Sequence, residues 1–423
     1  MDTVERPRLV ASDELAAIRA RVEAAHDRFV GDLATLVGID CGSYTKAGVD
    51  AVGRWTASFL EALGARVEVV PDDRLGDTVV GLFAGSSEGP SVVLIGHMDT
   101  VFDPGTVAER PFRVDGTRAY GPGVTDMKAG LLAGLYALHA LRDVAPDADE
   151  AWLPVGRLVF VANPDEEIGS PVSTPVIRRR AAESDVALVL ECARANGDIV
   201  SSRKGVADLL LTVTGRAAHA GVEPEKGRSA ILEAAQKTVA LHALSGRWPG
   251  VTCNVGVVRG GTRPNVVAAA CHLEVDLRAT TRETMEAAEA EMRAICERSS
   301  VPDVTCAVEE RHRHWPMEKL ERSARLVDHA VGLAAALGFP LKDAATGGAS
   351  DANTTAGMAV PTIDGLGPVG GNDHSPAEYL ELDSIVPRVS LLAGLLLAIG
   401  RDETIASWRA ERVARHATGR QPE

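Results

Sequence analysis

The sequence predicts an α/β protein whose main sheet is flanked by helices and whose chain is interrupted by a smaller α+β domain. Three observations lead to this prediction. Short apolar runs typical of fully buried strands alternate with amphipathic helical patterns. Histidines or acidic residues follow several of these runs, at the edge where α/β sheets bind ligands. Residues 207–311 follow the order strand, helix, strand, strand, helix, strand, which is that of a ferredoxin-like domain.

The elements before the insertion follow from the spacing of their apolar residues. Helical spacing predicts amphipathic helices in two regions, 13–37 and 51–63. Apolar runs predict strands at 66–70, 78–83, 91–95, 157–162 and 185–190, and helical spacing returns at 127–142. The longest apolar stretch, 389–400, is shorter than the ~20 residues that span a bilayer, and we expect it to be a buried helix.

The remaining elements define the expected domain boundaries. Within the insertion we expect strands at 207–215, 251–258, 266–278 and 303–310 and helices at 229–244 and 283–297. A helix at 320–337 and a glycine-rich loop at 367–376 then return the chain to its earlier pattern. We therefore expect a main domain formed by residues 1–206 and 312–423, with the inserted domain at 207–311.

Composition and charge are those of a soluble enzyme with more than one core. The chain has 423 residues, of which 45% are hydrophobic and 24% are charged. A net charge of −15 argues against nucleic acid and anionic membranes as partners, because both require a basic surface. The six cysteines form no Cys-x-x-Cys pair and the N-terminus shows no secretory signal, so we expect reduced thiols in the cytoplasm.

His97 and Asp99 directly follow the central expected strand at 91–95. Alternate residues of an extended chain point to the same side, so the Asp99 carboxylate can reach one nitrogen of the His97 ring. Metal-binding histidines are oriented in this way. Taken alone, the same pattern is also typical of a strand-end histidine followed by a turn-forming aspartate.

Further acidic residues and a second histidine stand at comparable positions. Asp126 follows a glycine-rich loop at the entrance of a helix, where an aspartate is commonly only an N-cap. Glu166 and Glu167 follow one expected strand, although such a pair is commonly a solvated loop. Glu191 follows the next strand, and His374 lies in the last glycine-rich loop.

These residues together favour a metal site. Carboxylates gathered at one sheet edge would repel one another and raise their own pKa values unless cations lay between them. Two histidines with three carboxylates suit zinc or another borderline divalent ion. If one carboxylate bridges, the set can hold two ions. Neighbouring residues of an extended loop point in opposite directions, so one of Glu166 and Glu167 can bind metal while the other acts as a base.

Several motifs occur in a fixed order along the chain. They are His97-Met98-Asp99-Thr100, Gly121-Pro122-Gly123, Asp126-Met127-Lys128-Ala129-Gly130, Asp165-Glu166-Glu167-Ile168-Gly169-Ser170, Glu191, Gly215-Arg216-Ala217-Ala218-His219-Ala220-Gly221, Gly347-Gly348-Ala349-Ser350-Asp351-Ala352-Asn353 and His374-Ser375. In this order they resemble the co-catalytic zinc peptidase family, which contains the bacterial glutamate carboxypeptidases, aminoacylases and desuccinylases. The resemblance implies a zinc-peptidase-like mixed sheet in a catalytic domain, with the inserted domain as a lid and dimerisation surface.

The resemblance also implies a ligand set. It implies two Zn²⁺ ions, with Co²⁺ or Mn²⁺ as substitutes, bridged by Asp126. His97 and Glu191 would bind one ion, and Glu167 and His374 would bind the other.

The catalytic roles follow from the same resemblance. Glu166 would be the general base, Asp99 would orient the metal-binding histidine that precedes it, and His219 would help to stabilise the oxyanion. We also expect the peptide bond between Asp126 and Met127 to be cis.

The substrate contacts come from the resemblance and from charge. Asn265 and Gly348 match positions in substrate-binding motifs of the family. Lys204, Arg278 and Arg313 are candidates for binding a substrate carboxylate, since a guanidinium can do so bidentately. Each of these three cations can equally be a solvated surface charge.

The implied reaction is hydrolysis of an amide bond next to a free carboxylate in a small peptide or N-acyl amino acid. Glu191 resembles the carboxypeptidase and desuccinylase side of the family, and the motifs at 347–353 and 374–379 look most like those of carboxypeptidases that release a C-terminal glutamate. An N-acyl amino acid deacylase, of the aminoacylase or desuccinylase type, would use the same metal chemistry with a different acyl pocket. A two-metal phosphoesterase and a non-catalytic dimeric binding protein are alternatives from other classes. We expect a homodimer formed through residues 207–311.

Overall fold

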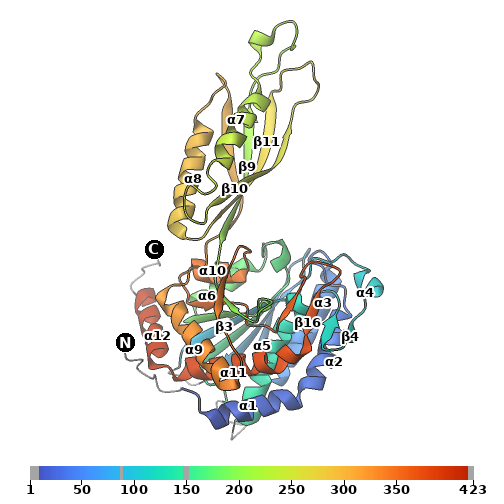
Figure 1. The fold of residues 1–423 in the computed structure, drawn as a ribbon, viewed down its shortest axis with the longest axis vertical. Helices are drawn as coiled ribbons and strands as arrows, with labels where there is room; N and C mark the ends of the chain where they lie inside the picture. The colour runs from blue at the N-terminus through green and yellow to red at the C-terminus, as the bar shows by residue number, and fades with distance from the viewer. Residues whose placement is uncertain (1–8, 86–88, 146–151, 418–423) are drawn as a thin grey trace. The chain divides into compact units, whose positions relative to one another are not determined.

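The computed structural model describes residues 9–85, 89–145 and 152–417, which divide into two compact units. Unit 1 contains the residues before 202, residues 319–345 and those from 350 onward, and unit 2 contains residues 202–318 and 346–349. In Figure 1 both ends of the chain belong to unit 1, whereas unit 2 is drawn mainly in green and yellow. The chain passes between the units within β8 (Ile199–Arg203) and β13 (Asp343–Thr346), and also after residues 318 and 349.

Unit 1 is built on a six-stranded mixed sheet with the order β1-β2-β6-β3-β7-β14. Its strands are β1 (Arg66–Val70), β2 (Thr78–Ala84), β3 (Ser91–His97), β6 (Arg157–Asn163), β7 (Val186–Val189) and β14 (Thr362–Ile363). The neighbours β6, β3, β7 and β14 run parallel, and the pairs β1–β2 and β2–β6 are antiparallel. The expected α/β fold with a mixed sheet is therefore confirmed, and four strands end at one edge.

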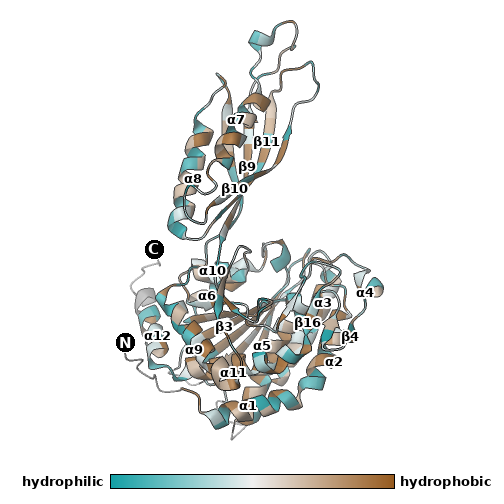
Figure 2. Ribbon diagram, in the orientation of Figure 1, coloured by the Kyte–Doolittle hydropathy of each residue, from teal (hydrophilic) through white to brown (hydrophobic). Residues whose placement is uncertain are grey.

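Helices pack against this sheet because their apolar faces continue its core. Val92 and Leu94 of the fully buried strand β3 belong to the main hydrophobic cluster, together with residues of α5 and α11. Figure 2 shows α11 as a mostly apolar helix. The helices of unit 1 are α1 (Ser12–Ala24), α2 (His26–Val37), α3 (Lys46–Ala62), α4 (Thr106–Glu109), α5 (Ala129–Val144), α6 (Thr174–Ala182), α9 (Glu321–Leu337), α10 (Asp351–Gly357), α11 (Ile385–Arg401) and α12 (Glu403–Ala417).

The expectation of a buried apolar helix at 389–400 is confirmed by α11. The segment Leu382–Arg401 is long and apolar enough to cross a membrane, yet 67% of its most apolar window is buried inside the protein. Its side chains contribute to the core of unit 1.

A second, four-stranded sheet of unit 1 was not expected from the sequence. Its order is β15-β16-β5-β4, from β4 (Arg113–Asp115), β5 (Arg118–Tyr120), β15 (Gly370–Gly371) and β16 (Tyr379–Glu381). Strands of two or three residues are too short to show an apolar period. Because β16 pairs with β5, the loop after β5 lies beside the loop between β15 and β16.

Unit 2 has the expected ferredoxin-like order. It contains β9 (Gly205–Thr214), α7 (Ala230–His242), β10 (Thr252–Gly260), β11 (Ala270–Ala279), α8 (Arg282–Glu297) and β12 (Thr305–His314). The antiparallel sheet has the order β10-β11-β9-β12. Ser229 and Thr281 cap the two helices through their hydroxyl groups, which explains where these helices begin.

The boundaries of unit 2 differ from the expected 207–311. β9 begins at Gly205 and β12 continues to His314, and the ladder between them pairs Val206 with His314. Both expected boundaries therefore lie inside hydrogen-bonded strands, and the compact unit extends from residue 202 to residue 318. The apolar pattern of these strands fades before their hydrogen bonding ends.

We predict that Gly130→Ala destabilises unit 1. A Cβ atom at this position of α5 would lie 1.9 Å from the carbonyl oxygen of Leu190, so helix and chain would have to separate. Overpacking of this kind costs about 1–3 kcal/mol, measurable as a lower denaturant midpoint of the metal-free protein. Gly31→Ala in α2 is the matched control, because a Cβ atom there meets nothing within 4 Å. It should leave the midpoint unchanged or raise it, and a similar loss in both variants would contradict the steric explanation.

Candidate metal centre

The candidate ligands converge at the edge where the parallel strands end. His97 is the last residue of β3, Glu191 follows β7, and Glu166 and Glu167 lie on the turn after β6. Asp126 lies at the entrance of α5, where a cis peptide bond links it to Met127, as expected from the sequence. Two groups of side chains offer ligand atoms within 4.8 Å of one another: His97, Glu166 and Glu191, and His97, Asp126 and Glu167.

Asp126 occupies the middle of the cluster. Its Oδ1 atom lies 3.2 Å from Nε2 of His97, and its Oδ2 atom lies 3.1 Å from Nε2 of His374. The same nitrogen of His374 is 3.1 Å from Oε2 of Glu167, and Nε2 of His97 is 3.7 Å from Oε1 of Glu191. One aspartate thus joins two groups, each with one histidine and one glutamate.

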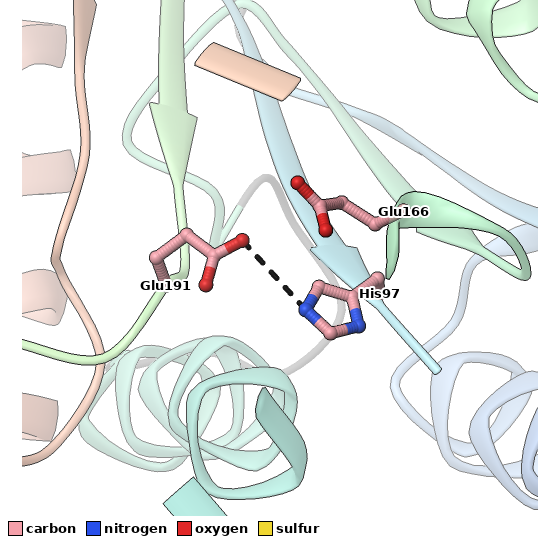
Figure 3. A group of neighbouring side chains, drawn as sticks. All are labelled: His97, Glu166 and Glu191. Atoms are coloured by element: carbon pink, nitrogen blue, oxygen red, sulfur yellow. Dashed lines mark ion pairs between the residues drawn. The ribbon is translucent and has the colours of Figure 1, made fainter. Parts of the chain in front are cut away.

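Glu166 approaches the first of these groups from the opposite side. Figure 3 shows the side chains of His97, Glu166 and Glu191, with the carboxylates of the two glutamates turned toward the same space. A carboxylate in this position can act on a molecule bound between the ligands.

Asp99 holds both the first histidine and the glutamate turn. Its carboxylate lies 3.3 Å from Nδ1 of His97, and its backbone oxygen lies 3.0 Å from the same atom. The carboxylate also accepts the backbone N–H groups of Glu166 and Glu167 at 3.1 and 3.2 Å, and the hydroxyl of Ser43 at 2.6 Å. With the Nδ1 proton directed at Asp99, Nε2 is the nitrogen of His97 that faces the cluster and can bind a metal once it has lost its proton.

The histidines and the central aspartate stabilise one another's charges. The hydrogen bonds to Asp126 and Glu167 raise the pKa of His374 to about 11. Burial opposes a charge on His97, but hydrogen bonds to Asp126 and Asp99 outweigh it and raise the pKa of the ring well above its ordinary value. Burial likewise opposes ionisation of Asp126, yet hydrogen bonds from the two histidines hold the pKa of its carboxyl below the usual range.

The pKa values of the two glutamates of the turn are both raised, in contrast to that of Asp126. Burial and the charge of Glu191 raise the pKa of Glu166 well above its ordinary value. Burial also raises the pKa of Glu167, although the hydrogen bond to His374 opposes this. Both shifts reflect negative charges crowded in a poorly hydrated place.

The residues fit a divalent metal. Oε1 of Glu167 is buried and has no hydrogen-bond partner among the described residues, so it is an acceptor that a cation would satisfy. Imidazole nitrogens and carboxylate oxygens form the ligand type of catalytic zinc sites. The only groups of potential ligands found in the described part of the chain are the two at this edge.

Two buried carboxylates near the cluster were not predicted from the sequence. Asp351 accepts the hydroxyl of Ser170 and the side-chain amide of Asn163, both at 2.6 Å, and burial raises its pKa to about 7. Glu378 accepts backbone N–H groups of the loop that carries Asp126. Asp351 belongs to a motif that we noted in the sequence, and Glu378 lies three residues after the His374-Ser375 motif, but their contacts join residues far apart in the chain.

The remaining expected site residues belong to unit 2. His219 and Asn265 are exposed and lie on neighbouring loops, since the backbone N–H of Ala220 donates to the carbonyl of Asn265 at 3.0 Å. Gly348 accepts a hydrogen bond from the Arg203 side chain at 3.1 Å. The backbone N–H of Lys204 donates to Thr346 at 3.1 Å.

The two expected carboxylate-binding arginines already have acidic partners. Arg278 binds Asp276 at 2.9 Å and the carbonyl of Gly347 at 2.9 Å. Arg313 binds Glu289 at 2.7 Å and also pairs with Glu310. A substrate carboxylate would have to compete with these ion pairs, which the sequence pattern around Arg313 did not reveal.

Fold and site together define a metallohydrolase, and comparison with known proteins agrees. The family described as peptidase family M20/M25/M40 matches residues 93–398. Carboxypeptidase G2 from Pseudomonas sp. (strain RS-16) is 30% identical over 401 residues, which cover 92% of this chain and 95% of that protein. The succinyl-diaminopimelate desuccinylase of Leptothrix cholodnii is 27% identical, with coverage of 78% and 89%.

A solved structure shares the fold. The aminopeptidase PepT of Bacillus cereus superposes with a TM-score of 0.72 at 24% identity and covers 88% of this chain and 98% of its own. The chain belongs to peptidase family M20/M25/M40, as the sequence motifs indicated, and is a zinc-dependent metallopeptidase or amidohydrolase. Membership of this class excludes the two alternatives from other classes, the two-metal phosphoesterase and the non-catalytic binding protein.

We predict that metal binding near neutral pH releases protons. In the metal-free site the raised pKa values keep His97 and His374 protonated, and each must lose a proton to become a ligand. Zinc titrations by calorimetry in buffers of different ionisation enthalpy should therefore show net proton release. His374→Ala is the control and should release fewer protons. Release that is zero, or unchanged in this variant, would contradict the displacement of a histidine proton by metal.

Proposed function

We propose that this protein is a two-zinc carboxypeptidase that releases a C-terminal glutamate-like residue from a small peptide or N-acyl substrate. The observation that carries the proposal is the Asp126 carboxylate between His97 and His374, each of which has its own glutamate nearby. Two cations would replace the positive charges of the protonated rings at these positions. Similarity to carboxypeptidase G2 over 92% of the chain supports the substrate class.

In this proposal Glu166 is the general base. Bound zinc would supply Lewis-acid polarisation of the amide carbonyl and a lower pKa for the attacking water. Glu166 takes a proton from the water and delivers it to the leaving nitrogen, a task suited to a carboxyl whose pKa burial has raised. Asp99 keeps both this turn and His97 in place.

Unit 2 would supply the contacts that select the substrate. Exposed His219 would stabilise the oxyanion, and its neighbour Asn265 would bind the substrate beside it. Gly348 and the cations of this unit, Lys204, Arg278 and Arg313, are the candidates for recognising the free carboxylate.

The second candidate function is an N-acyl amino acid deacylase. It uses the same cluster, and the similarity to a succinyl-diaminopimelate desuccinylase favours it. The two functions differ in the acyl group that is accepted, and not in the chemistry of bond cleavage.

We predict that the zinc-loaded enzyme hydrolyses folyl-glutamate and glutamate-terminated dipeptides with a higher kcat/KM than N-acetyl or N-succinyl amino acids. A side-by-side panel at defined zinc loading measures this preference. A higher kcat/KM for the N-acyl amino acids would establish the deacylase instead.

Glu166→Gln is the matched control for the panel. It should lower kcat for the best substrate by about 10²–10⁴-fold, the range of general base catalysis, while zinc content per chain stays unchanged. Loss of zinc in this variant would mean that Glu166 is a ligand and would reassign the base.

We also propose that the protein is a cytoplasmic homodimer formed through unit 2. β10 is an edge strand of the sheet, and α7 beside it in sequence exposes several apolar side chains. The exposed apolar residues of these two elements are Ile231, Leu232, Val239 and Val258. An unpaired edge strand with apolar neighbours is a surface that a second copy can cover.

We predict that Val239→Asp converts the dimer to monomers. Val239 is 74% exposed, so the substitution removes apolar contact from the proposed interface without disturbing a core. Sedimentation velocity measures the change. The control is Val69→Asp on β1 of unit 1, which is 52% exposed and should leave the dimer intact. Dissociation by Val69→Asp alone would move the interface to unit 1.

A further inference from the structure

One buried carboxylate outside the proposed ligand set binds the backbone of the loop that carries Asp126. Glu378 is 2% exposed. Its Oε2 atom accepts the N–H of Gly123 at 2.9 Å, and its Oε1 atom accepts those of Thr125 and Asp126 at 2.9 and 3.1 Å. Glu378 therefore binds the backbone of this loop, including that of Asp126.

The same glutamate belongs to the turn that carries His374. The N–H and hydroxyl of Ser375 donate to the carbonyl of Asn372 at 3.2 and 2.7 Å. The Asn372 amide donates to the carbonyl of Ala377 at 3.2 Å, and the N–H of Glu378 donates to the carbonyl of Ser375 at 3.2 Å. The turn is thus closed on itself, and Glu378 stands at its end.

The strands beside these loops keep them close together. Tyr379 in β16 pairs with Tyr120 in β5, directly before the loop that leads to Asp126. A Cβ atom at Gly370 would lie 2.0 Å from Oγ1 of Thr125, so the two segments approach as closely as a glycine allows. Glu378 acts within this contact and joins the turn of one proposed ligand to the loop of another.

The two histidines differ in how they are supported. The His97 side chain is 1% exposed and is held by Asp99, whereas that of His374 is 54% exposed. His374 therefore depends more on the position of its turn than His97 does.

We propose that Glu378 is a positioning residue that sets the spacing between Asp126 and His374, and thereby the affinity of the ion that His374 binds. This inference rests on the proposed two-ion site. Asp126 is shared by both ions, but His97 keeps its contact with Asp99, so loss of Glu378 should weaken the ion held with His374 more than the ion held with His97.

The experiment measures metal content, and not only activity. Zinc-loaded wild-type and Glu378→Gln proteins are dialysed against a graded series of metal buffers, and zinc per chain is determined by mass spectrometry. The glutamine replaces an acceptor oxygen with an NH₂ group that faces backbone donors. Changes behind metal ligands typically lower affinity by about 10–100-fold, and we expect this loss for the ion held with His374 and a smaller loss for the other ion.

Two further variants complete the design. Glu381→Gln changes the glutamate three residues after Glu378. It removes a surface ion pair with Arg118 and should leave the affinities for both ions unchanged. Glu378→Asp keeps the carboxylate on a shorter side chain and should lose affinity for the same ion to a smaller extent. If Glu378→Gln does not fold, this variant tests the role of Glu378. Wild-type protein with fewer than two ions would overturn the proposed function itself. Two ions in the wild type, with both weakened equally or neither weakened in the Glu378 variants, would overturn only the role of Glu378.

Discussion

The site depends on the pairing of one aspartate with two imidazole rings at the edge of a parallel sheet. Asp126 lies 3.2 Å from His97 and 3.1 Å from His374. Around it are further carboxylates whose burial opposes their charge, as the raised pKa values of Glu166 and Glu167 indicate. Negative charges gathered in this way require positive partners. In the metal-free chain the protonated rings supply these positive charges. A metal ion that replaces the ring protons binds among carboxylates that are already in place.

The surrounding structure fixes these charges through the backbone more than through the ligand side chains. Asp99 binds the backbone of the Glu166–Glu167 turn, and Glu378 binds the backbone of the Asp126 loop. Each buried carboxylate also contacts, or shares a turn with, a histidine of the cluster. The ligand geometry thus depends on two buried carboxylates, each of which links segments distant in sequence.

Local patterns in the sequence were enough to predict the strands, the edge at which they end and the cluster of candidate ligands. Apolar runs mark β3, β6 and β7 because buried strands need them, and polar residues at the strand ends mark the ligand edge. The short strands β5 and β16 and the contacts of Glu378 could not be predicted, because they join residues about 250 positions apart and leave no periodic signal. The ion pair between Arg313 and Glu289 was also missed, because Glu289 lies on another element, α8.

The placement of unit 2 within the chain has a consequence for biosynthesis. His97, Asp126, Glu167 and Glu191 precede unit 2, whereas His374 and Glu378 follow it. A ribosome making this protein therefore releases most of the metal-binding groups long before the last histidine exists. Until then the growing chain lacks one of the positive partners of these acids, and complete metal capture must wait until the segment after unit 2 has been made.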